Sequence, residues 1–552
     1  MSLVYFLLMV GALVAVHELG HLLAARAMGV GVVSFSLGFG PALLKVRFGG
    51  TEYRLGIVPL GGYVRLLGED PAEAVAPQDL ARSMSEKPLW RRVIVVCAGP
   101  AANLLFPLVI YFAFFLGHSH VPAAVIGDVF SGGPAAGSGL LPGDQVVEIS
   151  GTPVRTWEEL EAIVDGSRGR QLRFRVVRRG ETVYTYVTPR AQVLRSREGD
   201  AREQGLIGIA HAPRRAQIGV LDVTSPAARA GLRTGDRVLS VGGEEVETHE
   251  RLVELLAARP RRASIAYLRP RPAAVGFAEI RTYDAFLTDV VPDHASHGQG
   301  QGDAARALGI LPSELFVSGV EPGSPADRAG IRVGDLLTSL DGRPVDRWLL
   351  FDQALQAEPD RTFHLGWLRA TPSGAQSLFA DVKQDQLEVT DEYEQTRKNL
   401  VLGLQTERST GEGVMVPIPG RFAYAASHAI DRTGETIALM AHGLVSLALG
   451  DLPREEVGSL ITMYRMASVS GAKGWDAFLL MLALISINLG LINLLPVPVL
   501  DGGHLVVFAI EAIRRRRLTA RTREAVVLAG LVLIVSLTVL ALRNDVVRYL
   551  LR

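Results

Sequence analysis

The sequence predicts a polytopic α-helical membrane protein with four transmembrane helices and with soluble α+β domains inserted between the second and third. Two observations carry this prediction. Four stretches that are almost free of charge are each long enough to cross a bilayer, which takes about 20 apolar residues. Between the second and third stretch, one sequence pattern occurs three times, which is typical of repeated domains.

The composition of the 552-residue chain excludes several classes of protein. Its 57 Lys and Arg residues balance its 57 Asp and Glu residues, so it is not a nucleic-acid binder that works through overall basicity. Its 48% hydrophobic content argues against intrinsic disorder. The single cysteine, Cys97, excludes an intramolecular disulfide framework and a zinc site made of cysteine alone. A metal site in this chain would therefore need His, Asp or Glu.

The four apolar stretches cover residues 3–25, 93–116, 477–495 and 525–542. A further apolar stretch, 437–449, is too short to span, and we predict an interfacial or buried helix there. The alternative for the first stretch is a cleaved signal peptide. A signal peptide carries basic residues before its apolar part, but no Lys or Arg precedes Arg26. We therefore expect the first stretch to be a membrane helix.

Arginine-rich loops predict the orientation of the chain, because positively charged loops stay in the cytoplasm. Six arginines lie between Arg514 and Arg523, and several basic residues lie between Arg47 and Arg92. Both loops are therefore predicted to be cytoplasmic. The two termini and the inserted domains then face outward, which in a bacterial inner membrane is the periplasm.

The repeated pattern occupies residues 134–144, 226–236 and 325–335, and it begins with Pro-Ala and ends with Gly-Asp. In each copy we expect strands, a short helix near 157–164, 250–258 or 348–356, and then further strands. The first copy has Gly132 and Gly133 where the others have Ser-Pro. The glycine-rich residues 298–302 indicate a linker between the second and third copies.

The pattern is similar to that of PDZ domains of the bacterial protease-associated kind. The resemblance implies an open sheet edge beside a helix, where a peptide C-terminus or another extended segment can add as a strand. The alternative is a set of small domains that bind no peptide and act as a spacer or a steric filter. Three copies depart from the one or two that are usual in such proteases.

The residues that indicate chemistry lie in the first apolar stretch, which contains His17-Glu18-Leu19-Gly20-His21. Residues four apart share one face of a helix, so His17 and His21 can meet one zinc ion, with Glu18 as general base. Ionisable residues are costly inside a membrane and are functional candidates by default. Two alternatives remain open: a polar cluster that joins helices, and a soluble zinc enzyme whose helix does not span.

A third ligand is needed because catalytic zinc keeps three protein ligands and one open position. Asp501 follows the third apolar stretch, just after Pro496 and Pro498 break the helix. Broken backbone at membrane depth is tolerated where it is buried or lines a wet cavity. The predicted topology puts Asp501 and the end of the first helix at a similar depth, near the cytoplasmic side.

Together, His-Glu-x-x-His in the first helix and Asn-x-x-Pro-x-Pro-x-Leu-Asp-Gly at the third resemble the site-2 protease family of intramembrane zinc metalloproteases, and the repeats make the chain look like its bacterial regulator-of-sigma-E protease group. The resemblance implies that His17, His21 and Asp501 bind Zn²⁺, with Glu18 as the catalytic acid and base. It also implies contacts with an unwound substrate helix, made by Asn488, Asn493, Pro496 and Pro498. For the two asparagines, hydrogen bonding between helices is the alternative. His504 is expected to lie outside the ligand set.

Residues 35–69 and the small residues of 98–103 also look like this family. The resemblance implies a membrane-associated β-hairpin whose edge binds the substrate. The implied activity is cleavage within transmembrane segments of single-span proteins, such as anti-sigma factors after a first periplasmic cut, with remnant signal peptides as a further class. The implied partners are these substrates, peptides at the repeats and the lipid bilayer, without nucleic acid. A catalytically inactive PDZ scaffold or chaperone is the alternative.

The predicted organisation has ten segments. They are a first transmembrane helix (1–27), a cytoplasmic-side loop with the hairpin (28–92), a second transmembrane helix (93–117), three PDZ-like repeats (118–212, 213–297 and 303–390), a helical or interfacial region (391–475), a third transmembrane helix (476–498), a cytoplasmic loop with Asp501 (499–524) and a fourth transmembrane helix (525–543).

Overall fold

The computed structural model describes residues 1–69, 75–195, 201–271, 282–293, 301–390, 396–407, 410–450, 458–516 and 520–549. The chain divides into two compact units. The first, which we call the helical unit, comprises Met1–Ser119, Thr390–Thr396 and Ile418–Arg552. The second, the repeat unit, comprises His120–Val389 and Arg397–Pro417.

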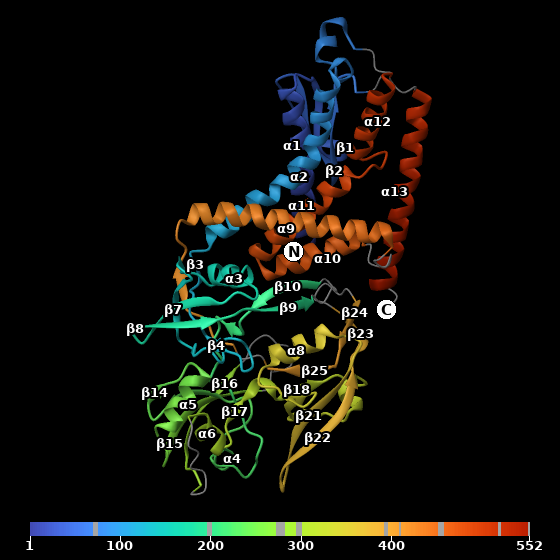
Figure 1. The fold of residues 1–552 in the computed structure, drawn as a ribbon. Helices are drawn as coiled ribbons and strands as arrows, with labels where there is room; N and C mark the ends of the chain where they lie inside the picture. The colour runs from blue at the N-terminus through green and yellow to red at the C-terminus, as the bar shows by residue number, and fades with distance from the viewer. Residues whose placement is uncertain are drawn as a thin grey trace. The chain divides into compact units, whose positions relative to one another are not determined.

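The helical unit contains seven of the labelled α-helices and one pair of long strands (Figure 1). Its helices are α1 (Ser2–Ala27), α2 (Leu89–Gly117), α9 (Arg421–Leu449), α10 (Leu460–Lys473), α11 (Trp475–Leu494), α12 (Asp501–Arg514) and α13 (Ala520–Tyr549); its strands are β1 (Val32–Phe48) and β2 (Thr51–Leu66); and its 3₁₀ turns are η1 (Pro77–Arg82) and η2 (Met84–Glu86).

Four helices of the described residues are long and apolar enough to cross a membrane, which confirms the predicted number. They are Ser2–Ala27, Leu89–Gly117, Trp475–Leu494 and Ala525–Val547. The third ends at Leu494 rather than at residue 498, because Pro496 and Pro498 lack the N–H that a helix needs and disfavour helical backbone before them. The second begins at Leu89 rather than at residue 93, because the charged residues Arg91 and Arg92 before the apolar stretch are also helical.

Helix α9 is longer than the sequence predicted, since the expected helix at 437–449 is only its C-terminal part. Charged residues near Asp431 hide the helix from a hydropathy window, but its pattern is amphipathic. Ala425, Ala429 and Thr433 are buried at a spacing of four, whereas Phe422 is 71% exposed. The buried face packs on α2, and the helix runs across the direction of α13 (Figure 1).

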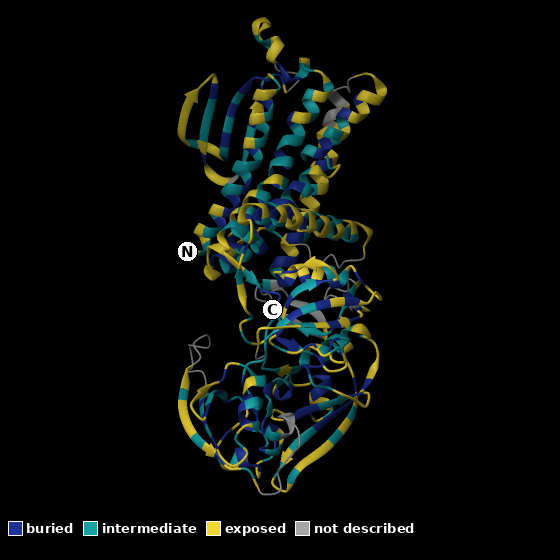
Figure 2. Ribbon diagram, turned by 60° about the vertical axis from the view of Figure 1, so that its left-hand side comes forward, coloured by how far each residue is buried: buried dark blue, intermediate teal, exposed yellow. Residues whose placement is uncertain are grey.

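Strands β1 and β2 do not form a simple hairpin. Ser34 pairs with both Glu52 and Arg65, so the first half of β1 lies between two segments of β2. The second half of β1 pairs only with residues 51–56. Residues 62–66 of β2 therefore form one edge of a folded sheet, and the second half of β1 forms the opposite, exposed edge (Figure 2).

The repeat unit contains three four-stranded sheets with one topology: β6-β5-β7-β8, β14-β13-β15-β16 and β20-β19-β21-β22. Each is antiparallel and carries one helix, α3 (Trp157–Asp165), α5 (His249–Ala257) or α8 (Trp348–Ala357). Figure 1 shows the three copies in green to yellow. The threefold sequence pattern is therefore a threefold structural repeat.

The remaining elements of this unit are short. The strands are β3 (His120–Pro122), β4 (Asp128–Val129), β5 (Gln145–Ile149), β6 (Thr152–Pro153), β7 (Leu172–Arg178), β8 (Glu181–Val187), β9 (Arg190–Arg195), β10 (Ala201–Leu206), β11 (Ile209–Ala210), β12 (Ile218–Gly219), β13 (Arg237–Val241), β14 (Glu244–Glu245), β15 (Ala263–Pro270), β16 (Tyr283–Val290), β17 (Leu311–Pro312), β18 (Val317–Val320), β19 (Leu336–Leu340), β20 (Arg343–Pro344), β21 (Thr362–Thr371), β22 (Gly374–Lys383), β23 (Asp385–Thr390), β24 (Thr396–Val401), β25 (Leu404–Thr406) and β26 (Met415–Pro417). The short helices are α4 (Pro226–Arg229), α6 (Gln301–Ala307), α7 (Pro325–Arg328) and η3 (Ser313–Leu315).

The aspartate that ends each repeated pattern has a structural role. Asp144, Asp236 and Asp335 are each at most 2% exposed. Each accepts two hydrogen bonds from one arginine at the end of its own sheet, at 2.6–2.8 Å, and the arginines are Arg178, Arg269 and Arg369. Bidentate pairs of this kind fix geometry as well as adding energy, so the Gly-Asp pattern locks the turn onto the sheet.

The second and third repeats end later in the chain than predicted. Ala305, Leu308 and Ile310 are buried in the core of the second repeat, and Leu402 is buried in the core of the third. The sequence predicted the ends of these repeats at residues 297 and 390. Residues 298–300 of the expected linker lie outside the described residues. The cause is a return of the chain to the start of its repeat, where Ala227 N–H donates to Leu308 O at 2.9 Å.

A buried ionic cluster joins the three repeats. Arg347 of the third repeat donates to both oxygens of Asp128 in the first, at 2.8 and 2.9 Å. Arg214 of the second lies 3.6 Å from the same carboxylate. His249 packs beside this cluster and is 6% exposed. Burial, together with the positive charges of Arg214 and Arg347, lowers the pKa of His249 to about 3. His249 is therefore neutral in the folded protein.

We expect the protein to lose stability as the pH falls from about 6.5 toward 3. In that window the unfolded chain binds a proton at residue 249 and the folded chain does not, so stability changes by up to about 1.4 kcal/mol per pH unit. Thermal unfolding at pH 7 and pH 5 measures the change, and His249→Gln should reduce it. The exposed His364 gives the control variant His364→Gln. An unchanged pH dependence in His249→Gln contradicts the prediction.

Candidate metal centre

Three predicted ligands from two distant parts of the sequence meet in the helical unit. His17 and His21 come from α1, and Asp501 is the first residue of α12. The Nε2 atoms of the two histidines are 3.3 Å apart. Asp501 Oδ2 lies 3.2 Å from His17 Nε2, and Oδ1 lies 3.5 Å from His21 Nε2. Among the described residues, these three form a group that could hold one metal ion.

The spacing fits zinc. Zn–N and Zn–O bonds of about 2.0–2.2 Å in a tetrahedral site place neighbouring ligand atoms about 3.3 Å apart. The two histidine nitrogens are 3.3 Å apart, and each lies 3.2–3.5 Å from one oxygen of the Asp501 carboxylate, which is close to that value. The two Asp501 distances are to different oxygens of one carboxylate, so His17, His21 and Asp501 would supply three protein ligands to a metal, the number that catalytic zinc sites use beside one open position.

A break in the backbone brings Asp501 to the histidines. After α11 ends at Leu494, the chain turns at Val499, which has φ of 114°, and α12 then begins at Asp501. The two following glycines leave no room for a side chain: a Cβ at Gly502 would lie 2.1 Å from the oxygen of Leu495. The Asp-Gly-Gly sequence therefore lets α12 start directly against the broken segment.

Helix α2 holds His21 in place from the other side. Nδ1 of His21 lies 2.8 Å from the carbonyl oxygen of Val95 and donates to it when Nε2 is the ligand atom. A Cβ at Gly99 would lie 2.2 Å from His21 Nε2. A Cβ at Gly20 would lie 2.3 Å from the oxygen of Ala98. Small residues on α1 and α2 thus allow the close helix contact on which the ligand geometry depends.

Glu18 and the β2 edge share a cavity with the three ligands. The cavity has a volume of about 640 Å³ and is lined by Glu18 and by Gly62–Val64. Glu18 is 8% exposed. A Cβ at Gly62 would lie 3.0 Å from Glu18 Cγ, so the strand approaches the carboxylate closely. The arrangement places a buried carboxylate, an open metal position and a strand edge around one space.

The other predicted site residues divide into two groups. Asn493 and Pro498 reach the site: Asn493 Nδ2 lies 3.5 Å from His17 Nδ1, and Pro498 lines the cavity, as does His504. Asn493, Asn488 and Pro496 are not among the residues that line the cavity, and no contact of Asn488 or Pro496 with the ligands is observed among the described residues. Asn488 lies farther back along α11 than Asn493, and Pro496 is exposed beyond the helix end.

One residue at the site was missed by the sequence prediction. Asn103 of α2 is fully buried, and its Nδ2 lies 3.3 Å from His17 Nδ1. The segment 98–103 drew attention for its resemblance to the family and for its small residues, but no role was predicted for Asn103. The available signal was an amide side chain inside an apolar span, since such polar residues usually have a partner.

Comparisons with known proteins agree with this geometry. The family model described as peptidase family M50 matches residues 5–537. Protease RseP of Yersinia pestis is 28% identical, over 99% of this chain and 98% of the relative. Regulator of sigma E protease of Salmonella typhi and a zinc metalloprotease of Vibrio cholerae are each 27% identical over the same shares. With a match over nearly its whole length, this chain belongs to peptidase family M50, the site-2 proteases, and is a zinc-dependent intramembrane metalloprotease.

Proposed function

We propose that the protein hydrolyses peptide bonds within transmembrane segments of single-span membrane proteins, including anti-sigma-factor-like proteins already cut on their periplasmic side, and remnant signal peptides. The observation that supports this most is the meeting of His17, His21 and Asp501 beside Glu18, with both histidines inside a helix apolar enough to span. A catalytically inactive scaffold has no use for this arrangement. Cleavage of a single-span substrate by the purified protein in detergent tests the proposal.

In the proposed mechanism, His17, His21 and Asp501 hold the metal, and Glu18 moves the proton. Zinc bound there supplies a Lewis acid that activates a water molecule and polarises the scissile carbonyl. Glu18 takes a proton from the attacking water and passes it to the nitrogen of the departing amine as the C–N bond breaks. Glu18 is buried and lines the same cavity as the three ligands, which supports this role.

Substrate binding follows from the edge strand. A helical substrate hides its backbone amides, so it must unwind before a protease can reach a peptide bond. Residues 62–66 are an edge of the β1–β2 sheet, and Gly62–Val64 line the cavity. An unwound segment can pair with this edge by strand addition. Pro498 lines the same cavity and Asn493 lies beside His17, so we propose that both contact the unwound segment, whereas Asn488 and Pro496 would bind it farther from the metal.

We place the protein in a bacterial inner membrane, with its termini and repeats in the periplasm and its metal centre near the cytoplasmic side. The support is the distribution of arginine, which is dense between Arg514 and Arg523. The exposed apolar residues of β1 support contact of the sheet with lipid. They include Leu43, Leu44 and Phe48, which are 66%, 60% and 73% exposed.

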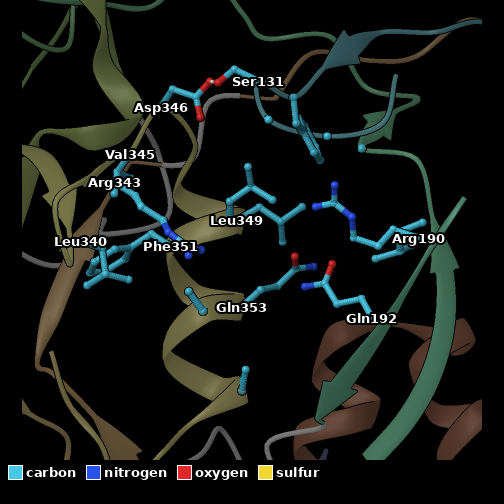
Figure 3. A pocket seen from close by; sticks show the side chains of 18 of the residues that line it. Ser131, Arg190, Gln192, Leu340, Arg343, Val345, Asp346, Leu349, Phe351 and Gln353 are labelled. Carbon is cyan, nitrogen blue, oxygen red and sulfur yellow. Dashed lines mark hydrogen bonds between the residues drawn. The ribbon is translucent and has the colours of Figure 1, made fainter. Parts of the chain in front are cut away.

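The repeats are proposed to be PDZ-like domains that receive peptides. A cavity of about 1140 Å³ lies between β9 of the first repeat and α8 of the third (Figure 3). Leu349 and Phe351 line it, and Figure 3 shows Arg190 on the wall opposite Leu349. The guanidinium groups of Arg190 and Arg343 have no ion-pair partner among the described residues. Apolar side chains beside two such cations suit a peptide whose C-terminal carboxylate follows an apolar residue.

We expect Arg190→Glu and Arg343→Glu each to weaken binding of such a peptide by roughly tenfold, because a charge-assisted contact is lost and a repulsion replaces it. Fluorescence anisotropy of a labelled peptide with a free C-terminus measures the affinity. Arg306→Glu, on the exposed surface of α6, is the charge-matched control. Equal binding by all three variants contradicts this peptide site and favours a spacer or filter role.

A further inference from the structure

We infer that Asn103 positions His17 for metal binding, by accepting a hydrogen bond from His17 Nδ1 through its side-chain oxygen. The inference rests on the proposed role of His17 as a ligand. It adds a residue of α2 to a site whose ligands come from α1 and α12. Asn103 acts through His17 and does not touch the reacting atoms, so it is a positioning residue.

The evidence begins with the environment of Asn103. The residue is 0% exposed within the helical unit. Its amide group lies 3.3 Å from His17 Nδ1, and its buried Oδ1 has no hydrogen-bond partner among the described residues. A buried amide oxygen without a donor costs about 1–3 kcal/mol. A nearby donor that could satisfy it is therefore significant.

The chemistry of a metal-bound histidine supplies that donor. When Nε2 binds a metal, Nδ1 carries the proton and can only donate. The amide nitrogen of Asn103 also only donates, so the two nitrogens cannot bond to each other. Exchange of the amide oxygen and nitrogen leaves the shape of the group unchanged. It places Oδ1 opposite Nδ1 and turns a clash of two donors into a hydrogen bond.

The backbone around Asn103 is independently fixed. Ser486 Oγ of α11 donates to the carbonyl oxygen of Asn103 at 2.8 Å, and both residues are fully buried. This contact holds the turn of α2 that carries Asn103, but it does not involve the amide side chain. Ser486 therefore offers a control that perturbs the same residue without removing the proposed acceptor.

Asn493 is the other asparagine near His17, and it differs from Asn103 in position. Its Nδ2 lies 3.5 Å from His17 Nδ1, and it stands near the end of α11, where the helix breaks. Asn103 lies deep between helices and is fully buried, whereas Asn493 is only half-buried. We therefore assign the orientation of His17 to Asn103 and substrate contact to Asn493. His21 has the corresponding support from the oxygen of Val95.

The test measures zinc affinity of the full-length protein by competition with a chromophoric chelator. We expect Asn103→Leu to weaken zinc binding by about 10–100-fold, the usual effect of losing a partner of a ligating histidine. Asn103→Asp keeps an acceptor and should bind zinc at least as tightly as the native protein. Ser486→Ala should lower the thermal stability of the zinc-free protein and leave zinc affinity unchanged. Asn493→Leu should keep zinc affinity but lose cleavage. Cobalt spectra of the Asn103 variants report on ligand geometry independently of activity.

Native zinc affinity in Asn103→Leu overturns the inference, as does an equal loss in Asn103→Asp and Asn103→Leu. If Asn103→Leu does not fold, zinc affinity of Asn103→Asp decides alone. A hydrogen-bond acceptor role predicts zinc binding at least as tight as in the native protein, whereas a role in packing alone predicts weaker zinc binding, because a carboxylate is then buried without need. His17→Ala separates this inference from the proposed function. If the native protein binds zinc no better than His17→Ala, the proposed metal centre fails. If His17→Ala loses zinc but Asn103→Leu binds zinc as tightly as the native protein, only the positioning role of Asn103 fails.

Discussion

Glu18→Gln should lower the rate of substrate cleavage by about 10²–10⁴-fold and leave zinc binding intact. The amide is nearly the same size as the carboxylate but cannot take a proton, and general base catalysis contributes that range of rate. Glu18 is not one of the three ligands, so zinc content should stay at that of the native protein. Cleavage of a single-span substrate in detergent, followed by gel densitometry, measures the loss.

The matched control for this substitution is Asp476→Asn. Asp476 lies exposed at the start of α11. Its substitution by asparagine therefore removes a carboxylate from the helical unit without changing the site. Cleavage by Asp476→Asn should equal that of the native protein. Undiminished cleavage by Glu18→Gln contradicts the mechanism, whereas a simultaneous loss of zinc would mean that Glu18 belongs to the ligand set.

Gly99→Ala should weaken zinc binding by about 100-fold, at the upper end of the range for residues that orient ligands. The added Cβ would lie 2.2 Å from His21 Nε2, so the ring must leave its position. Gly11→Ala is the matched control, because it adds the same methyl group to the neighbouring helix α1 at a place with no atom within 4 Å. It should bind zinc normally and gain up to about 1 kcal/mol from helix propensity.

Native zinc affinity in Gly99→Ala contradicts the close approach of α1 and α2 on which the site depends. Thermal unfolding of the zinc-free forms completes the comparison. If Gly99→Ala unfolds at the native temperature but binds zinc weakly, the methyl group acts on the site. If the unfolding temperature and the zinc affinity of Gly99→Ala both fall, the methyl group acts on helix packing. The structural account of Gly99 as a space for the His21 ring is then wrong.

The membrane helices and the ligand motif could be predicted because each depends on residues that are close in sequence. His17 and His21 share a helical face by their spacing alone. Asp501 could be proposed only from a motif, since nothing in its sequence position requires it to lie 3.2 Å from His17. Its placement depends on how α11 breaks after Leu494 and on the space left by Gly502.

The features that were missed depend on contacts between distant segments. Asn103 meets His17 only because α1 and α2 pack closely at Gly20. Arg347 and Asp128 pair across two repeats, which the pattern of a single repeat cannot reveal. The late ends of the repeats have the same origin, since Leu308 and Leu402 return to the start of their own domains. Helix α9 was predicted too short for a different reason, because charged residues on its exposed face interrupt the apolar run.

The most direct test of the central claim is the position of the cut. A single-span substrate is incubated with the native protein in detergent, and mass spectrometry identifies the new termini. We predict a cut inside the apolar transmembrane segment that disappears with a zinc chelator, in His17→Ala and in Asp501→Ala, and that returns when zinc is added back to the native protein. Cuts confined to the soluble flanks of the substrate, or cleavage that survives these substitutions, would contradict the account.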